Sequence, residues 1–176
     1  MKIFFLTFGS VFLLFGCAAK PINVTVGDAE FSESAKAFKI SPESAKIYFI
    51  NGRQGSTLSM KADMPGGAIL LINNREVGQI DKQDVLVANI HPKTYTFSWK
   101  YPSDDSKHIE LTKDIKAGEV IMLEPFWDLG GIGFGLVGAL LAPPEYKISE
   151  SQNKNIIQGK RVVRANTCPV EICIQD

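Results

Sequence analysis

Few side chains in this sequence stand in the arrangements that catalysis or metal binding requires. A metal site needs three or four converging ligands, and the two histidines, His91 and His108, belong to no such cluster. No serine lies in a Gly-x-Ser-x-Gly nucleophile elbow, and no cysteine is paired with a histidine by its context. We therefore predict no metal site, no catalytic residue and no cofactor, and we expect that the protein is not an enzyme.

The most unusual segment, residues 129–142 (LGGIGFGLVGALLA), is uncharged and rich in glycine. It matches the dinucleotide pattern Gly-x-Gly-x-x-Gly but lacks the surrounding βαβ unit and the acidic residue about 20 positions further on, so we expect no nucleotide cofactor. The segment is also shorter than the ~20 residues that span a bilayer. It either packs over one end of a β-domain or contacts a membrane or a partner, because soluble domains rarely expose so large an apolar patch. The candidate contact surface comprises Phe126, Trp127, Ile132, Phe134, Leu136 and Val137.

A second apolar surface comes from residues 94–101, where aromatic and polar side chains alternate. A period of two places Tyr95, Phe97, Trp99 and Tyr101 on one face of a strand. Four aromatic rings on one face favour the core of a sandwich. The alternative is a platform on which a sugar or peptide stacks, and Tyr101, nearest the strand end, is then the candidate ligand contact.

The N-terminus has the build of a secretory signal, with Lys2 followed by an apolar stretch over residues 3–15. It ends in Leu14-Phe15-Gly16-Cys17, which resembles the bacterial lipoprotein signal. The resemblance implies cleavage between Gly16 and Cys17, a thioether-linked diacylglycerol on Cys17 and acylation of its new amino group. Two or three acyl chains hold a protein firmly on a membrane. Ala18 rather than Asp after the cysteine implies, by the same resemblance, the outer membrane facing the periplasm. The open alternatives are an ordinary secreted protein and an uncleaved anchor.

The other two cysteines, Cys168 and Cys173, are predicted to form a disulfide. Proteins exported to an oxidising compartment commonly pair an even number of cysteines. An extended strand would hold the two residues ~16 Å apart, so the bond requires a turn, with which Pro169 is compatible. A reactive redox pair is the weaker alternative, because no Cys-x-x-Cys motif surrounds these residues.

Composition places the rest of the chain in one ordinary globular domain. Of 176 residues, 45% are hydrophobic and 22% charged, with 19 basic and 19 acidic side chains. A neutral chain gives no electrostatic reason to bind nucleic acid. We divide it into a signal peptide (1–16), a lipidated cysteine and tether (17–29), a β-rich domain (30–165) and a C-terminal tail with the cysteine pair (166–176).

Hydrophobic periodicity predicts mainly β-structure for this domain. Strands are expected at residues 46–50, 68–72, 76–80, 85–90, 94–101, 108–115 and 119–124. A short helix is expected within residues 28–38. A second helix, at residues 150–158, would open with a capping box formed by Ser149 and Gln152. The expected fold is a single antiparallel β-sandwich, immunoglobulin-like or a partly open barrel, with a glycine-rich apolar connection and a short C-terminal helix.

Several short motifs occur in a characteristic order over residues 30–160. They are Ala45-x-Ile47-Tyr48, Asn73-Asn74 before a strand with Val77-Gly78, Pro92 before the aromatic strand, Gly118 before a strand, and a closing passage from Tyr146 to Glu150. This order resembles the lipoprotein-borne domain-of-unknown-function family 2846. The resemblance implies a β-rich domain on a lipid anchor and no established reaction.

These features together favour a non-enzymatic outer-membrane lipoprotein that faces the periplasm and acts in envelope interactions or assembly. Its expected partners are the membrane, through the lipid, and an envelope protein. One alternative is a membrane-active or oligomerising component that inserts residues 129–142 into lipid. Another is a cell-wall or small-ligand binding module that uses Tyr101.

Overall fold

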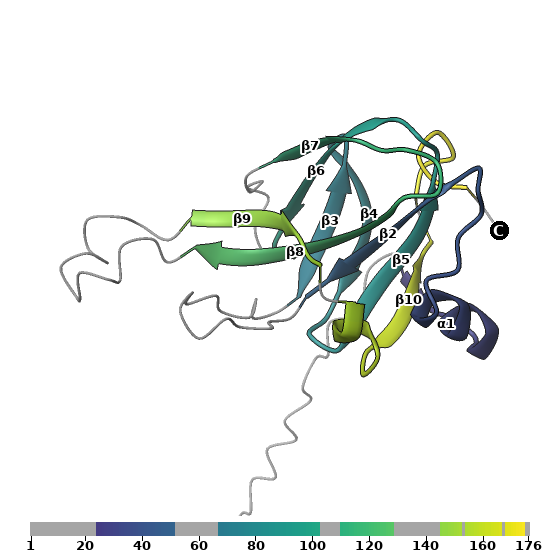
Figure 1. Cartoon of the computed structure of the whole chain (residues 1–176). Coiled ribbons are helices and arrows are strands. Elements are labelled where there is room, and N and C mark those ends of the chain that lie inside the picture. The colour runs from purple at the N-terminus through teal and green to yellow at the C-terminus, as the bar shows by residue number, and fades with distance from the viewer. Residues whose placement is uncertain are drawn as a thin grey trace, which may run out of the picture.

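The structure is a computed structural model, and it describes residues 24–51, 67–102, 110–128, 145–152, 154–166 and 168–174. For residues 126–128 and 145–147 it describes the backbone but not the side chains. Two β-sheets pack face to face, with a helix against the outer face of the larger sheet (Figure 1). The predicted mainly-β, sandwich-like fold is confirmed.

The larger sheet has six strands in the order β1-β10-β5-β2-β8-β9. Their bounds are β1 Val24–Val26, β10 Arg161–Ala165, β5 Asp84–Ile90, β2 Ala45–Ile50, β8 Val120–Asp128 and β9 Glu145–Glu150. The pairs β10–β5 and β2–β8 are parallel and the others antiparallel. The sequence predicted antiparallel pairing alone. Each parallel pair joins strands that are not consecutive in the chain, which is what parallel neighbours require.

The smaller sheet is antiparallel throughout, in the order β4-β3-β6-β7. It contains β3 Ala68–Ile72, β4 Arg75–Ile80, β6 Thr94–Lys100 and β7 Leu111–Asp114. Asn73 and Asn74 join β3 to β4 with φ of 49° and 65°. Positive φ at both residues is the geometry of a tight two-residue hairpin, and asparagine tolerates it better than most side chains.

The core lies between the two sheets and is dominated by the aromatic face of β6. Tyr95, Phe97 and Trp99 are fully buried there. The prediction that this face supplies the core is therefore confirmed. Tyr101, the fourth member, is half-buried and packs its ring against Trp99, with centroids 5.1 Å apart.

The outer face of the six-stranded sheet is covered by α1, Ala29–Lys36, and by the 3-10 helix η2, Lys154–Ile157. Asp28 caps α1 by accepting a hydrogen bond from the Phe31 backbone N–H at 2.8 Å. The Tyr48 hydroxyl donates to the Ala35 carbonyl at 2.7 Å, and burial raises the pKa of this phenol. Every side chain of β2 is buried because this sheet is covered on both faces.

Of the helix predicted at residues 150–158, the structure has only the 3-10 helix η2, and the predicted capping box is wrong. Ser149 lies in β9, paired with Glu124 of β8, so it cannot cap a helix. A single 3-10 turn follows at η2, and then the unpredicted strand β10. Strand β1 was also not predicted, and it lies among the residues assigned to the tether. Strands of three and five residues are too short to show a period. In β10 (RVVRA), arginines on either side of the two valines conceal a segment whose valines are buried on both faces of the sheet.

An ion network joins the edges of the two sheets. The Lys113 Nζ on β7 lies 2.9 Å from Glu119 Oε1 and 2.7 Å from Glu150 Oε2 on β9. Partial burial of Glu119 raises the pKa of its carboxyl. Hydrogen bonds from the Lys116 backbone N–H and from the Lys113 side chain, together with the positive charges of both lysines, have the larger opposite effect, so the pKa of Glu119 lies below its usual value. A carboxyl whose pKa is lowered by folding stabilises the fold above its unfolded pKa, and this contribution disappears as pH falls through the folded pKa.

We expect Glu119→Gln to lower the free energy of unfolding at pH 7 by up to about 1 kcal/mol, because the network is partly exposed. The difference from the wild type should shrink as the pH falls below about 4.3, where the unfolded carboxyl is itself protonated. Urea titrations at pH 7 and pH 3 measure the difference in the free energy of unfolding between the variant and the wild type. Glu110→Gln, at an exposed position just before β7, is the matched control. A constant difference between Glu119→Gln and the wild type across both pH values would contradict the assignment.

Candidate functional site

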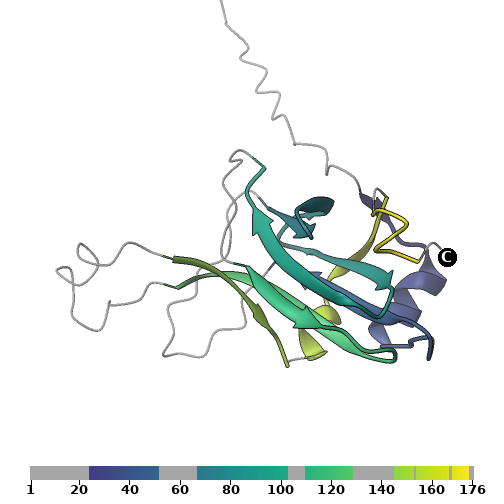
Figure 2. The ribbon, with the colours of Figure 1, turned by 90° about the horizontal axis from the view of Figure 1, so that it is seen from above.

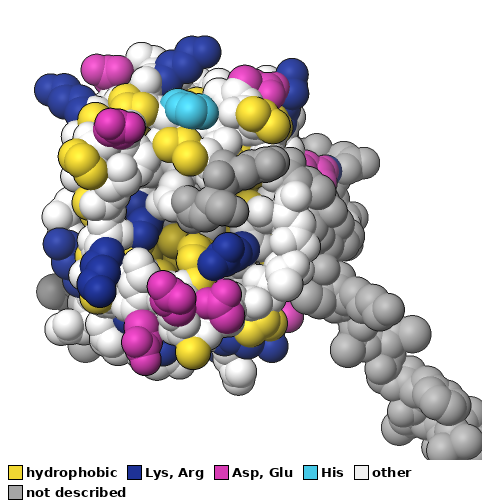
Figure 3. All heavy atoms as spheres, turned by 90° about the vertical axis from the view of Figure 1, so that its right-hand side faces the viewer, with side chains coloured by type: hydrophobic (Ala, Val, Ile, Leu, Met, Phe, Trp, Pro, Cys, Tyr) yellow, Lys and Arg dark blue, Asp and Glu magenta, His cyan; other side chains and the backbone are white. Residues whose placement is uncertain are grey.

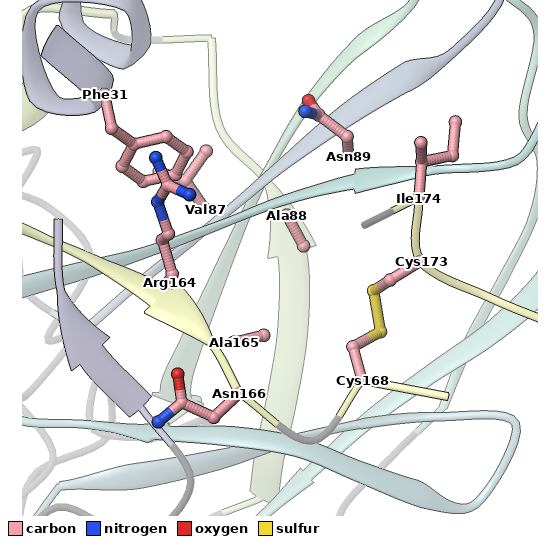
Figure 4. Close-up of a pocket in the computed structure, with 10 residues that line it drawn as sticks. All are labelled: Phe31, Val87, Ala88, Asn89, Arg164, Ala165, Asn166, Cys168, Cys173 and Ile174. Carbon is pink, nitrogen blue, oxygen red and sulfur yellow. A yellow bond between two sulfur atoms is a disulfide. The ribbon is translucent and has the colours of Figure 1, made fainter. Parts of the chain in front are cut away.

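A cleft of about 320 Å³ opens between α1, the adjacent strands β5 and β10, and the C-terminal segment. These elements lie together on the right-hand side of Figure 1 and again in Figure 2. Figure 3 faces this side of the molecule and shows apolar side chains in a hollow, with basic side chains beside it and acidic ones below it. Figure 4 shows the lining residues, which come from segments far apart in the sequence.

The cleft lies where β5 changes its hydrogen-bonding partner. Strand β10 runs parallel to β5 as far as the pair Arg164–Val87 and then turns away. Further along β5, residues 172–174 replace β10 as the hydrogen-bonding partner and run antiparallel to β5. The Ile174 N–H donates to the Asn89 carbonyl at 2.9 Å, and the His91 N–H donates to the Ile172 carbonyl at 3.0 Å. The gap between the departing and the arriving segment is the cleft.

A disulfide between Cys168 and Cys173 forms one wall of the cleft, with the Cα atoms 5.6 Å apart (Figure 4). Pro169 provides the turn, since its carbonyl accepts hydrogen bonds from the N–H groups of Ile172 and Cys173, both at 2.8 Å. The structure confirms the predicted pairing. Both cysteines belong to the core between the sheets, so the bond fastens the C-terminal segment to that core.

The opposite wall carries a stacked cation. The Arg164 guanidinium carbon lies 3.9 Å from the centroid of the Phe31 ring on α1, and Figure 4 shows the two groups lying one over the other. Val162 and Val163 point to opposite faces of β10, so the alternation places Arg164 on the outer face, beneath α1. The ion pair of Arg164 with Asp28 is 3.7 Å long, beyond hydrogen-bond distance.

A second pocket of about 290 Å³ adjoins the first, because Phe31 and Asn89 line both. Its polar wall includes Lys39 and Lys46, and the Lys46 ammonium donates to the Lys39 carbonyl. We call the two connected pockets the basic cleft. Among the described residues that line it, Arg164, Lys39 and Lys46 are charged and none is acidic.

The sequence did not predict this cleft. Tyr101, the predicted stacking residue, packs on Trp99 and does not line it. Of the predicted contact surface, the backbones of Phe126 and Trp127 lie in β8, while their side chains and all of Ile132, Phe134, Leu136 and Val137 are outside the described residues. Gly16 and Cys17 are outside them as well. The predicted disulfide and the helix predicted within residues 28–38 were the sequence signals that pointed to this end of the molecule.

The described part of the chain holds no group of three or more histidine, cysteine or acidic side chains placed to bind a metal ion. Within the same residues, no helix is both long and apolar enough to cross a membrane. No family model, curated protein or solved structure matches this chain. The basic cleft itself combines cations, amides and an apolar wall, a set of groups suited to recognising a ligand that is anionic on one side and apolar on the other.

Proposed function

We propose that the protein is a non-enzymatic lipoprotein of the cell envelope, anchored through acylated Cys17 in the outer membrane and facing the periplasm. The folded domain serves as an interaction module, and the basic cleft is its contact site. This assignment moves the expected contact from residues 126–142 to the side of the domain that carries α1 and the C-terminal segment.

The observation that carries the proposal is the position of the cleft relative to the anchor. Val24, the first residue of β1, pairs with Ala165 of β10, and Ala165 lines the cleft. Cys17 is only seven positions before Val24. A lipid on Cys17 would therefore hold this side of the domain next to the membrane. The Cys168–Cys173 disulfide supports the same compartment, because such bonds persist where the surroundings are oxidising.

Metabolic labelling with an alkyne fatty acid, followed by membrane fractionation, tests the anchor. We expect the wild type to carry label and to sediment with membranes. Cys17→Ser should lose the label, because the thioether and the acylated amine both form on this cysteine. Ala19→Ser, which keeps both Cys17 and the disulfide, is the matched control. Label that persists in Cys17→Ser would disprove the anchor.

In-cell photo-crosslinking tests the contact site. Asn166 is exposed at the rim of the cleft, so a photoreactive residue there replaces little packing. We expect adducts from this position and none from exposed Lys116, which lies in the turn before β8. Equal adducts from both positions would show that the cleft is not the contact site.

A further inference from the structure

We propose that the basic cleft binds the phosphate of an anionic phospholipid headgroup, so that this side of the domain docks on the membrane that carries the anchor. The inference rests on the proposed function for the placement of the cleft beside the membrane. Charge, geometry, an exposed apolar side chain and tether length each support it.

The charge of the cleft differs from that of the chain. The full sequence has 19 basic and 19 acidic residues, yet the described lining includes three cations and no carboxylate. Asp28 lies 3.7 Å from Arg164 just outside the lining, so the excess of positive charge is confined to the cleft and attracts an anion that enters it. The ligand that complements it carries negative charge.

The geometry of Arg164 favours a phosphate. Stacking on Phe31 holds the guanidinium plane in one orientation, which lowers the entropy lost when a ligand binds. The planar fork of an arginine matches two oxygens of a phosphate. The Asp28 Oδ2 atom lies 3.7 Å from Arg164 Nη2. At this distance the carboxylate orients the guanidinium through its charge but does not form a hydrogen bond with Nη2.

An exposed valine in the loop between the two cysteines favours a membrane over a soluble anion. Among the described residues, the exposed large hydrophobic side chains are Val26, at 58% of its full exposure, and Val170, at 67%. Val170 lies in the loop between the two cysteines that line the cleft, whereas Val26, on β1, pairs with Val163 of β10 and does not line it. Apolar side chains next to a basic site are the combination by which peripheral proteins enter the headgroup region.

The tether keeps this surface close to lipid. Seven extended residues span at most about 25 Å. With Cys17 in the bilayer, β1 and the adjoining cleft stay within that distance of the headgroups. Docking is then nearly intramolecular, and a weak site suffices because its effective ligand concentration is high.

Vesicle sedimentation of residues 18–176, produced without leader or acyl group, tests the proposal. This segment contains every residue that the structure describes. We expect it to bind vesicles containing phosphatidylglycerol and not vesicles of phosphatidylcholine alone. Arg164→Glu should lower the partition coefficient roughly 25-fold, since the reversal changes two charges and each charge near an anionic surface contributes roughly fivefold. Lys116→Glu, with the same charge change outside the cleft, should change it less than twofold.

Two further variants separate the sources of the phosphate. Arg164→Gln removes the charge without adding a carboxylate near Asp28, and circular dichroism melts establish that each variant is folded. Val170→Ser should weaken vesicle binding while leaving any binding of soluble glycerol phosphate unchanged. If glycerol phosphate at matched concentration binds as tightly as vesicles do, the site takes a free phosphate ester and membrane docking is overturned.

Failure of the inference is distinct from failure of the proposed function. If the wild type does not sediment with anionic vesicles, or if Arg164→Glu and Lys116→Glu weaken binding equally, the headgroup site is wrong whether or not Cys17 is acylated. If Cys17 carries no lipid but the vesicle results are as expected, the headgroup site is supported and the proposed lipid anchor is disproved.

Discussion

Replacing Trp99 by alanine is expected to lower the free energy of unfolding by about 4 kcal/mol, the usual cost of removing a large aromatic ring from a core. Trp99 is fully buried on the inner face of β6, and in the register of the smaller sheet it stands opposite Leu70 of β3. No neighbouring element can close over the cavity without moving a strand. Urea unfolding followed by circular dichroism measures the loss.

Tyr101→Ala is the matched comparison, because Tyr101 directly follows β6 and packs its ring against Trp99 but is half-buried. We expect it to cost roughly 1–2 kcal/mol, in proportion to the smaller area removed from water. The contrast separates core packing from ligand stacking along one aromatic face. Equal losses for the two substitutions would mean that Tyr101 is as much a part of the core as Trp99.

The elements that the sequence predicted well are those whose pattern is local. Strict alternation over residues 94–101 identified β6 and its buried face, and a continuous apolar run identified β3 to the residue. The helix at α1 was also found, since Asp28 provides a cap and the segment has good helix formers. In each case a property of neighbouring residues decides the structure.

What the sequence could not predict depends on residues far apart in the chain. The parallel pairing of β10 with β5 is fixed by Asp84, which is fully buried and accepts hydrogen bonds from Arg161 Nε at 2.7 Å and Nη2 at 3.1 Å. Nothing near either residue in the sequence indicates this partnership. The stacking of Arg164 on Phe31 is equally non-local, so the cleft could not be anticipated. The predicted helix at 150–158 is shortened to the 3-10 helix η2 because pairing of β9 with β8 outweighed a capping pattern.

The disulfide connects the stability of the domain to the proposed docking. Changing Cys168 and Cys173 together to serine should lower the free energy of unfolding by about 2 kcal/mol, because the bond closes a short loop and restricts the unfolded chain only modestly. Thermal melts of the double variant, and of the wild type with and without reductant, measure this effect. The two treatments should agree, since both remove the same covalent constraint.

The same double substitution should weaken binding to phosphatidylglycerol vesicles. The effect should exceed what the small increase in the unfolded fraction would cause. The bond holds residues 172–174 against β5, and these residues build the wall of the cleft opposite Arg164. Loosening that wall also releases Val170, which borders the cleft in the loop closed by the bond. Arg164 stays stacked on Phe31, so the loss should be smaller than the roughly 25-fold loss expected for Arg164→Glu. Unchanged vesicle binding in a folded double-serine variant would mean that the C-terminal segment has no part in the site, and that the guanidinium alone recognises the headgroup.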